Sequence, residues 1–143
     1  MGVVAWLEPL KRYDLSYWYE MYFQLLKLDQ VTCVRFAVWC VTLAEGNVLE
    51  SELCLGVVGR WLDGRASPSE CRAAWYACSH LPNSYAAAWA AKAAWAASPV
   101  EWASAASLAA ETAAEDLEAR GSPGLRDVDW YFRRLVGASD PIP

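Results

Sequence analysis

The sequence predicts an all-α fold, a single-domain bundle of about seven short helices without a sheet, and three observations lead to this prediction. Nine of the thirteen residues from Tyr85 to Ala97 are alanine, which has the highest helix propensity of all residues. Serine and proline followed by glutamate recur at 67–70 and 98–101, a pattern typical of helix starts. No stretch alternates apolar and polar residues with the period of two that a half-buried strand requires.

The first helix is predicted near residues 15–28, after an N-terminal arm at 1–14, with Asp14 as a candidate cap. Its polar side chains form one narrow stripe, and aromatic and apolar side chains cover the rest. The stripe consists of Ser16, Glu20, Gln24 and Lys27. A helix with so little polar face needs burial on several sides. We expect it to belong to the core, and a dimer or partner face is the other reading.

The second helix, near 31–45, is apolar almost all round, so we expect it to be central. Asp29 can cap it, and its Arg35 should lie at the edge of the bundle or pair with a carboxylate. The third helix is predicted near 48–63. A capping box at Asn47 to Glu50 starts it, and Gly46 and Gly64 occupy places where C-terminal glycine caps are expected.

The fourth and sixth helices are predicted near 68–80 and 99–120, each with serine at the N-cap, proline at the first helical position and glutamate at the third. Their inner faces mix small residues with one tryptophan, which lets helices interdigitate. The seventh helix is predicted near 125–136, with Ser122-Pro123 as its start and 137–143 as a C-terminal tail. Gly121 ends the helix before it.

The fifth helix, near 84–97, has two different sides, with Asn83 or Ser84 as its cap. Alanine fills one side, and Tyr85, Trp89, Lys92 and Trp95 share an arc on the other. Because lysine is rarely fully buried, we expect the alanine side to pack inward and the arc to face solvent or a partner protein. The alternative is that the N-terminal segment covers the rings and the lysine reaches solvent between them.

Two further groups are candidates for binding a partner. Glu111, Glu115 and Glu118 follow one another along the sixth helix without an interleaved base, which is typical of a solvated face or of a stripe that meets a basic partner. In the last helix, Trp130 is expected beside Arg133 and Arg134, away from an apolar side. Tryptophan and arginine are frequent in interface hot spots, although such a stack is also common surface packing.

Composition excludes several classes of function. Twelve basic against seventeen acidic residues give a net charge of −5, and no basic run is present, so binding to nucleic acid is not expected. The longest uncharged stretch, 73–91, contains several polar residues and fails as a membrane span. No targeting signal is recognised at the N-terminus, and we expect a cytoplasmic protein without membrane contact.

Titratable residues give little support for catalysis. Five cysteines without a Cys-x-x-Cys pair are expected to be reduced, buried and apolar in role, and the pairs seven apart are too distant on a helix to chelate zinc. The only histidine, His80, is expected to cap carbonyl groups at the end of its helix. No catalytic triad, metal motif or nucleotide loop is present. We therefore expect no catalytic residue, no cofactor and no metal site.

The segment 60–68, the residues 70–74 and the alanine- and tryptophan-rich run to Ala97 resemble the alanine-rich helical immunity proteins of the Imm-5 type. The resemblance covers roughly residues 31–136, and the N-terminal aromatic segment has no counterpart. Histidines that some relatives carry between alanines are missing here, which removes any metal or acid–base role. The resemblance implies a non-enzymatic protein that neutralises a toxin or another effector protein by binding it.

The leading hypothesis is thus a cytoplasmic binding protein of the immunity or inhibitor type. One alternative, implied by the same resemblance, is a phage-encoded inhibitor of a host defence or transcription factor. Another is a structural homo-oligomer, such as a homodimer formed through the aromatic helix near 15–28. A small hydrolase or transferase would need a cleft around His80 or Glu111 and Glu115, and the single histidine makes it the weakest of the hypotheses.

Overall fold

The computed structural model describes residues 15–45, 49–81 and 84–136, and within them the chain forms seven helices and no strand. The helices are α2 (Leu15–Leu25), α3 (Gln30–Glu45), α4 (Leu49–Leu62), α5 (Pro68–Cys78), α6 (Tyr85–Trp95), α7 (Pro99–Ala119) and α8 (Gly124–Leu135). The predicted all-α fold is confirmed, and each predicted helix is found. The main difference is α2, which ends at Leu25 and continues only as a turn. The predicted arm and tail lie outside the described residues.

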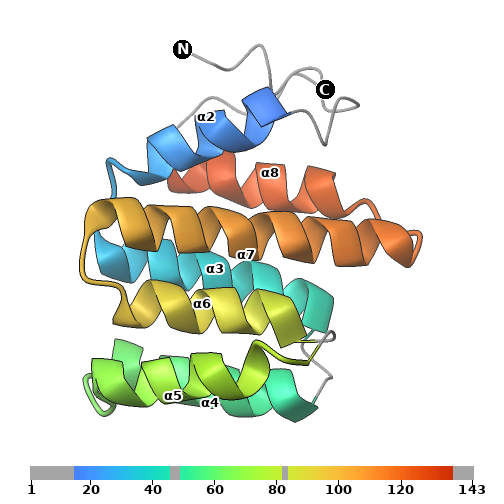
Figure 1. The fold of residues 1–143 in the computed structure, drawn as a ribbon. Helices are drawn as coiled ribbons and strands as arrows, with labels where there is room; N and C mark the ends of the chain where they lie inside the picture. The colour runs from blue at the N-terminus through green and yellow to red at the C-terminus, as the bar shows by residue number, and fades with distance from the viewer. Residues whose placement is uncertain (1–14, 46–48, 82–83, 137–143) are drawn as a thin grey trace.

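The helices are stacked in layers with their axes close to one direction (Figure 1). One end of the stack is formed by α2 and α8, and the other end by α4 and α5. Between them lie α3, α6 and α7, which pack against one another. The predicted central place of α3 is confirmed, since Val34, Phe36 and Val41 are fully buried. Its Arg35 is exposed at the edge of the bundle, which is the first of the two predicted alternatives for this residue.

Alanine makes the centre of the stack tight. Seven alanines of α6 are buried, which confirms that its alanine side packs inward. The facing side of α7 is also rich in alanine, and short side chains let two helix backbones approach closely. The start of α3 is tied to the end of α6, where Gln30 Nε2 donates hydrogen bonds to the carbonyl oxygens of Ala93, Ala94 and Ala96. These carbonyls have no partner within their own helix, so Gln30 supplies one.

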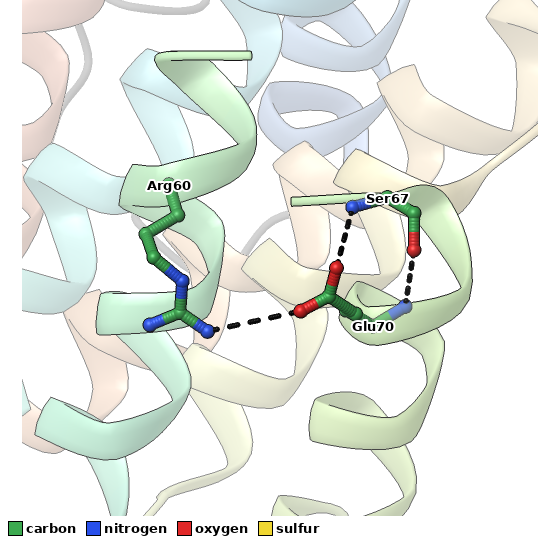
Figure 2. A network of polar contacts seen from close by, with 3 residues as sticks. All are labelled: Arg60, Ser67 and Glu70. Atoms are coloured by element: carbon green, nitrogen blue, oxygen red, sulfur yellow. Dashed lines mark hydrogen bonds and ion pairs between the residues drawn. The ribbon is translucent and has the colours of Figure 1, made fainter. Parts of the chain in front are cut away.

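The capping box predicted at the start of α5 is confirmed (Figure 2). The Ser67 hydroxyl accepts a hydrogen bond from the backbone N–H of Glu70 at 3.2 Å, and the Glu70 carboxylate accepts one from the backbone N–H of Ser67 at 3.0 Å. The other carboxylate oxygen lies 3.9 Å from Arg60 Nη2 on α4. One glutamate therefore both starts α5 and links it to α4.

The other predicted starts are correct only in part. Ser98 caps α7 by accepting from the N–H of Glu101, but the Glu101 carboxylate accepts from Ala97 N–H rather than from Ser98. Asp29 caps α3 by accepting a hydrogen bond from the N–H of Thr32. Hydrogen bonding by the Thr32 side chain, and after it by the Thr32 backbone, lowers the pKa of the Asp29 carboxyl. Ser84 precedes α6 without capping it by its side chain, because its hydroxyl instead donates to the carbonyls of residues 78 and 81.

Pro123 is the N-cap residue of α8 and not its first helical residue, so the helix starts one position later than the Ser122-Pro123 pattern predicts. At the helix ends, Gly64 and Gly121 have φ angles of 76° and 82°, as expected of C-terminal glycine caps. The N–H of Arg65 donates to the carbonyl of Arg60, which closes the cap after α4. The predicted caps at Asp14, Gly46, Asn47 and Asn83 lie outside the described residues.

A buried polar cluster joins α2 to α8. The Tyr17 hydroxyl donates to Asp129 Oδ1 at 2.9 Å, and Arg133 Nε donates to Asp129 Oδ2, also at 2.9 Å. The Arg133 side chain is 0% exposed. Its predicted place on the surface beside Trp130 is therefore wrong. The reason is that its charge is matched inside the protein by Asp129, one helical turn earlier.

The five cysteines are all buried and form no disulfide, as predicted. Burial raises the pKa of the Cys33 thiol to about 12 and that of the Cys71 thiol to about 11. Neutral, buried thiols are poor nucleophiles and poor metal ligands. No group of three or more potential metal ligands occurs in the described part of the chain.

Among the described helices, none combines the length and the apolar character needed to cross a bilayer.

Candidate functional site

Helices α5 and α6 together present a surface of aromatic and basic side chains. Tyr85, Trp89, Lys92 and Trp95 lie along α6, and α5 packs against them with Arg72, Trp75 and Tyr76. We call these seven residues the α5–α6 surface. Both helices come from adjacent positions in the chain and lie side by side in the stack (Figure 1). The buried alanines of α6 hold this surface outward, because they occupy its other side.

The rings of this surface contact one another across the two helices. The ring centroids of Trp75 and Trp95 are 5.8 Å apart, with an interplanar angle of 57°. On α5 itself, Trp75 lies against Tyr76 with centroids 4.7 Å apart in an edge-on arrangement. Both distances are within the range in which aromatic pairs attract one another. The rings are thereby held in fixed positions before any partner arrives.

Two cations lie over these rings. Lys92 Nζ is 4.0 Å from the ring centroid of Trp95 and 5.0 Å from that of Trp75. Arg72 Cζ lies 5.6 Å from the Trp95 centroid and 5.5 Å from that of Tyr76. Neither cation forms an ion pair with a carboxylate of the described residues. In a chain of net charge −5, this is a local basic surface, and the faces of the aromatic rings attract its two cations.

A cavity of about 290 Å³ lies between α5 and α6, lined by Trp75, Ser79, Tyr85, Ala88 and Trp89, and it shares Trp75 with the cation–ring contacts. Ala88 is buried, so it forms a floor between the rings. Tyr85 is 44% exposed, whereas Trp89, Lys92 and Trp95 are each partly buried. The arrangement can hold an apolar or aromatic side chain against the rings and an acidic group near Lys92 or Arg72.

Of the two readings of the aromatic arc, the inward packing of the alanine side is confirmed. One side of the arc is covered by α5, which neither reading foresaw, and residues 1–14 of the N-terminal segment lie outside the described residues. Sequence reasoning missed Arg72, Trp75 and Tyr76 as members of this surface. Trp75 is the tryptophan that the sequence pattern assigns to the inner face of the helix predicted near 68–80. The available signal was the short connection after residue 78, which makes α5 and α6 antiparallel neighbours.

The predicted residues of the last helix are separated. Trp130 is 47% exposed and Arg134 Cζ lies 4.2 Å from the centroid of its ring, as expected of a surface stack. Arg133 points instead into the core. This stack lies on α8, at the opposite end of the molecule from α5 (Figure 1).

The predicted glutamates lie on α7. Glu115 is exposed, and Glu111 and Glu118 are partly buried. Burial, and next to it the charge of Glu115, raise the pKa of the Glu111 carboxyl. Glu111 lines a groove between α2 and α7 together with aromatic residues of α2.

His80 is exposed after α5, and its side chain shows no hydrogen bond within the described residues, so its expected capping role is not observed.

Comparison of the chain with protein-family models, with curated proteins and with solved structures gave no match. The resemblance to immunity proteins of the Imm-5 type therefore stays a prediction from the sequence.

Proposed function

We propose that this protein is a non-enzymatic binding protein that inhibits an effector protein, such as a toxin, by docking it on the α5–α6 surface. The single observation that carries the proposal is the pair of cations, Lys92 and Arg72, which lie over packed tryptophan rings and form no ion pair with a described carboxylate. Arginine and aromatic residues dominate interface hot spots, because their rings bury much area and their cations give direction. A partner with acidic and apolar side chains fits this surface best.

The preordered rings support a binding role over a purely structural one. A lysine that only served packing would be expected to extend its ammonium group into water. Lys92 keeps its ammonium over two rings instead, and one of these rings, that of Trp75, also lines the cavity. Fixing these side chains before binding lowers the entropy that association costs. The proposal applies to two kinds of partner, a bacterial toxin, or a host factor if this chain is a phage protein. Both kinds of partner would use the same contacts.

The test compares partner binding by variants that change the surface without emptying the core. Lys92→Met and Arg72→Met keep an unbranched apolar side chain and remove one charge each. The partner is isolated by affinity capture from the native host with the unmodified chain, and the purified pair is then measured by titration calorimetry. Each variant should weaken the complex by about 1 to 2 kcal/mol, which is roughly five- to thirty-fold in Kd.

Lys27→Met is the matched control, because Lys27 is exposed on the turn after α2 and belongs to another part of the surface. It should bind as the unmodified chain does, and all three variants should keep the thermal midpoint within about 2 °C. If Lys92→Met and Arg72→Met bind as tightly as Lys27→Met, the α5–α6 surface is not the docking site.

A structural homo-oligomer is a second candidate, which one observation favours. Tyr19 and Phe23 on α2 are 59% and 55% exposed, one turn apart, and such exposed rings are typical of contact surfaces. A second copy of the chain could bury them. The mass in solution between about 1 and 100 μM tests this by mass action, because a dimer through these rings should dissociate on dilution and in Tyr19→Ala. A monomer at every concentration contradicts it.

A further inference from the structure

The groove between α2 and α7 combines an aromatic wall with an acidic end. It has a volume of about 260 Å³ and is lined by Trp18, Tyr19, Tyr22, Ser104, Ser107, Leu108 and Glu111. Trp18 is almost fully buried and Tyr22 partly buried, whereas Tyr19 is largely exposed at the rim. The rings come from one helix and the carboxylate from the other. α2 lies along α7 at the end of the stack away from α5 (Figure 1).

The Glu111 carboxylate at this groove has no basic partner among the residues that the structure describes. Neither Glu111 nor Glu115 forms an ion pair with a lysine or arginine within the described ranges. The two lie one helical turn apart on α7, where like charges repel each other. Burial of the Glu111 carboxyl, and after it the charge of Glu115, raises the pKa of Glu111. A cation placed at the groove would relieve both costs, since it would neutralise the charge that burial and Glu115 disfavour.

Aromatic rings and a carboxylate together are the chemistry that recognises an organic cation. An ammonium or guanidinium group is attracted to the faces of tryptophan and tyrosine and pairs with a carboxylate. The apolar stem of a lysine or arginine side chain can lie along the rings of Trp18 and Tyr22 and on Leu108. The open rim at Tyr19 leaves room for the polypeptide to which this side chain belongs.

We infer that the α2–α7 groove is a docking pocket for a lysine or arginine side chain of a protein partner, held between the α2 rings and Glu111. This inference deepens the proposed function, on which it rests, by naming a second contact of opposite charge on the same partner. The α5–α6 surface would meet acidic groups of that partner, and the α2–α7 groove would take a basic one. Contacts of both signs would fix the orientation of the complex.

The experiment needs no partner protein. The probe is the peptide acetyl-Gly-Lys-Gly-amide, and its neutral counterpart carries norleucine in place of lysine. Binding is followed by proton–nitrogen NMR through the indole N–H signal of Trp18, assigned with Trp18→Phe. The lysine peptide should shift this signal in a saturable manner, with a Kd on the order of 1 to 10 mM for so small a ligand. The norleucine peptide should produce no saturable shift.

Glu111→Gln keeps the shape of the side chain and removes its charge, so it should weaken binding of the lysine peptide by about five-fold or more. Glu52→Gln is the matched control, an exposed glutamate on α4 at the other end of the molecule, and it should bind the peptide unchanged. The inference is overturned if the lysine peptide gives no saturable shift at about 50 mM, if norleucine binds as well, or if Glu111→Gln binds as the unmodified chain does. None of these results would contradict the proposal for the α5–α6 surface, because that proposal is tested separately with the Lys92 and Arg72 variants.

Discussion

Gly124 sets how closely α8 can approach α7. A Cβ atom at this position would lie 2.6 Å from the carbonyl oxygen of Ala114 and 2.6 Å from Leu117 Cβ. Both atoms belong to α7 at or next to the backbone, so neither can move aside easily. The absence of a side chain at Gly124 therefore lets the first residue of α8 pack directly against α7. This places Val128 and Phe132 in the core and leaves Trp130 on the surface.

Replacing Gly124 by alanine should destabilise the protein by about 1 to 3 kcal/mol, because the helices must separate to make room for Cβ. Gly56→Ala on α4 is the matched control, since nothing lies within 4 Å of its would-be Cβ. That substitution should stabilise the protein by roughly 0.5 to 1 kcal/mol through helix propensity. Urea unfolding measures both. Equal effects of the two substitutions would show that α8 does not touch α7 at this position.

Glu111 should make stability depend on pH in the opposite sense to a salt-bridged acid. Its pKa in the folded protein is raised, so the folded state binds the proton more tightly than the unfolded state does. The contribution of this group is therefore most favourable below the unfolded pKa and falls as the pH rises through the raised folded pKa.

Glu111→Gln should thus increase stability at pH 7 by a few tenths of a kcal/mol, since the residue is partly exposed and the repulsion is screened. The gain should vanish below about pH 4, where the native carboxyl is itself neutral. Thermal unfolding at pH 7.5 and pH 3.5 measures this difference, with Glu52→Gln as control. A loss of stability at pH 7.5 would mean that the carboxylate has a cationic partner in the free protein.

At the scale of the element, α6 is the helix on which the rest of the stack depends. It packs against α3, α4, α5 and α7, and its buried residues are all alanines. Any larger side chain on that side must push a neighbouring helix away. On its outer side the same helix carries the rings and Lys92, so a shift of α6 would also move the proposed docking surface.

Ala91→Leu should cost about 1 to 3 kcal/mol of stability, because the site is fully buried and already filled. Ala73→Leu is the matched control on the exposed side of α5, where the added side chain meets water and should change stability by less than about 0.5 kcal/mol. Denaturant unfolding compares the two. Equal stabilities would contradict the close packing of α6.

The helices were predictable because their signals are local. Serine caps, prolines at first helical positions and C-terminal glycines act within one turn of the chain, and they placed α5, α7 and the end of α4 correctly. Two starts were shifted or differently bonded, at Ser98 and Pro123, because a cap can exchange one backbone N–H for its neighbour at little cost.

The sites were harder to predict because they depend on which helices become neighbours. Arg133 looked like a surface residue in its own helix, and only the docking of α2 supplies the setting in which Asp129 and Tyr17 bury it. Trp75 and Arg72 likewise join the α6 arc only through the packing of α5 on α6. Helical periodicity gives the faces of each helix but not the partner of each face.

At the scale of the whole molecule, the stack carries two proposed contact surfaces of different chemistry. The α5–α6 surface has aromatic rings with two cations, and the α2–α7 groove has aromatic rings with the carboxylate of Glu111. Such a division favours one orientation of a bound partner over others, since the reversed complex would bring like charges together.

The central claim is that a partner protein docks on the α5–α6 surface, and hydroxyl-radical footprinting of the chain with and without the captured partner tests it most directly. The side chains of Tyr76, Tyr85 and Trp89 should lose most of their reactivity in the complex. Trp130, exposed on α8, should keep its own and serves as the internal reference. Unchanged reactivity of Tyr76, Tyr85 and Trp89 in a fully formed complex would contradict the account.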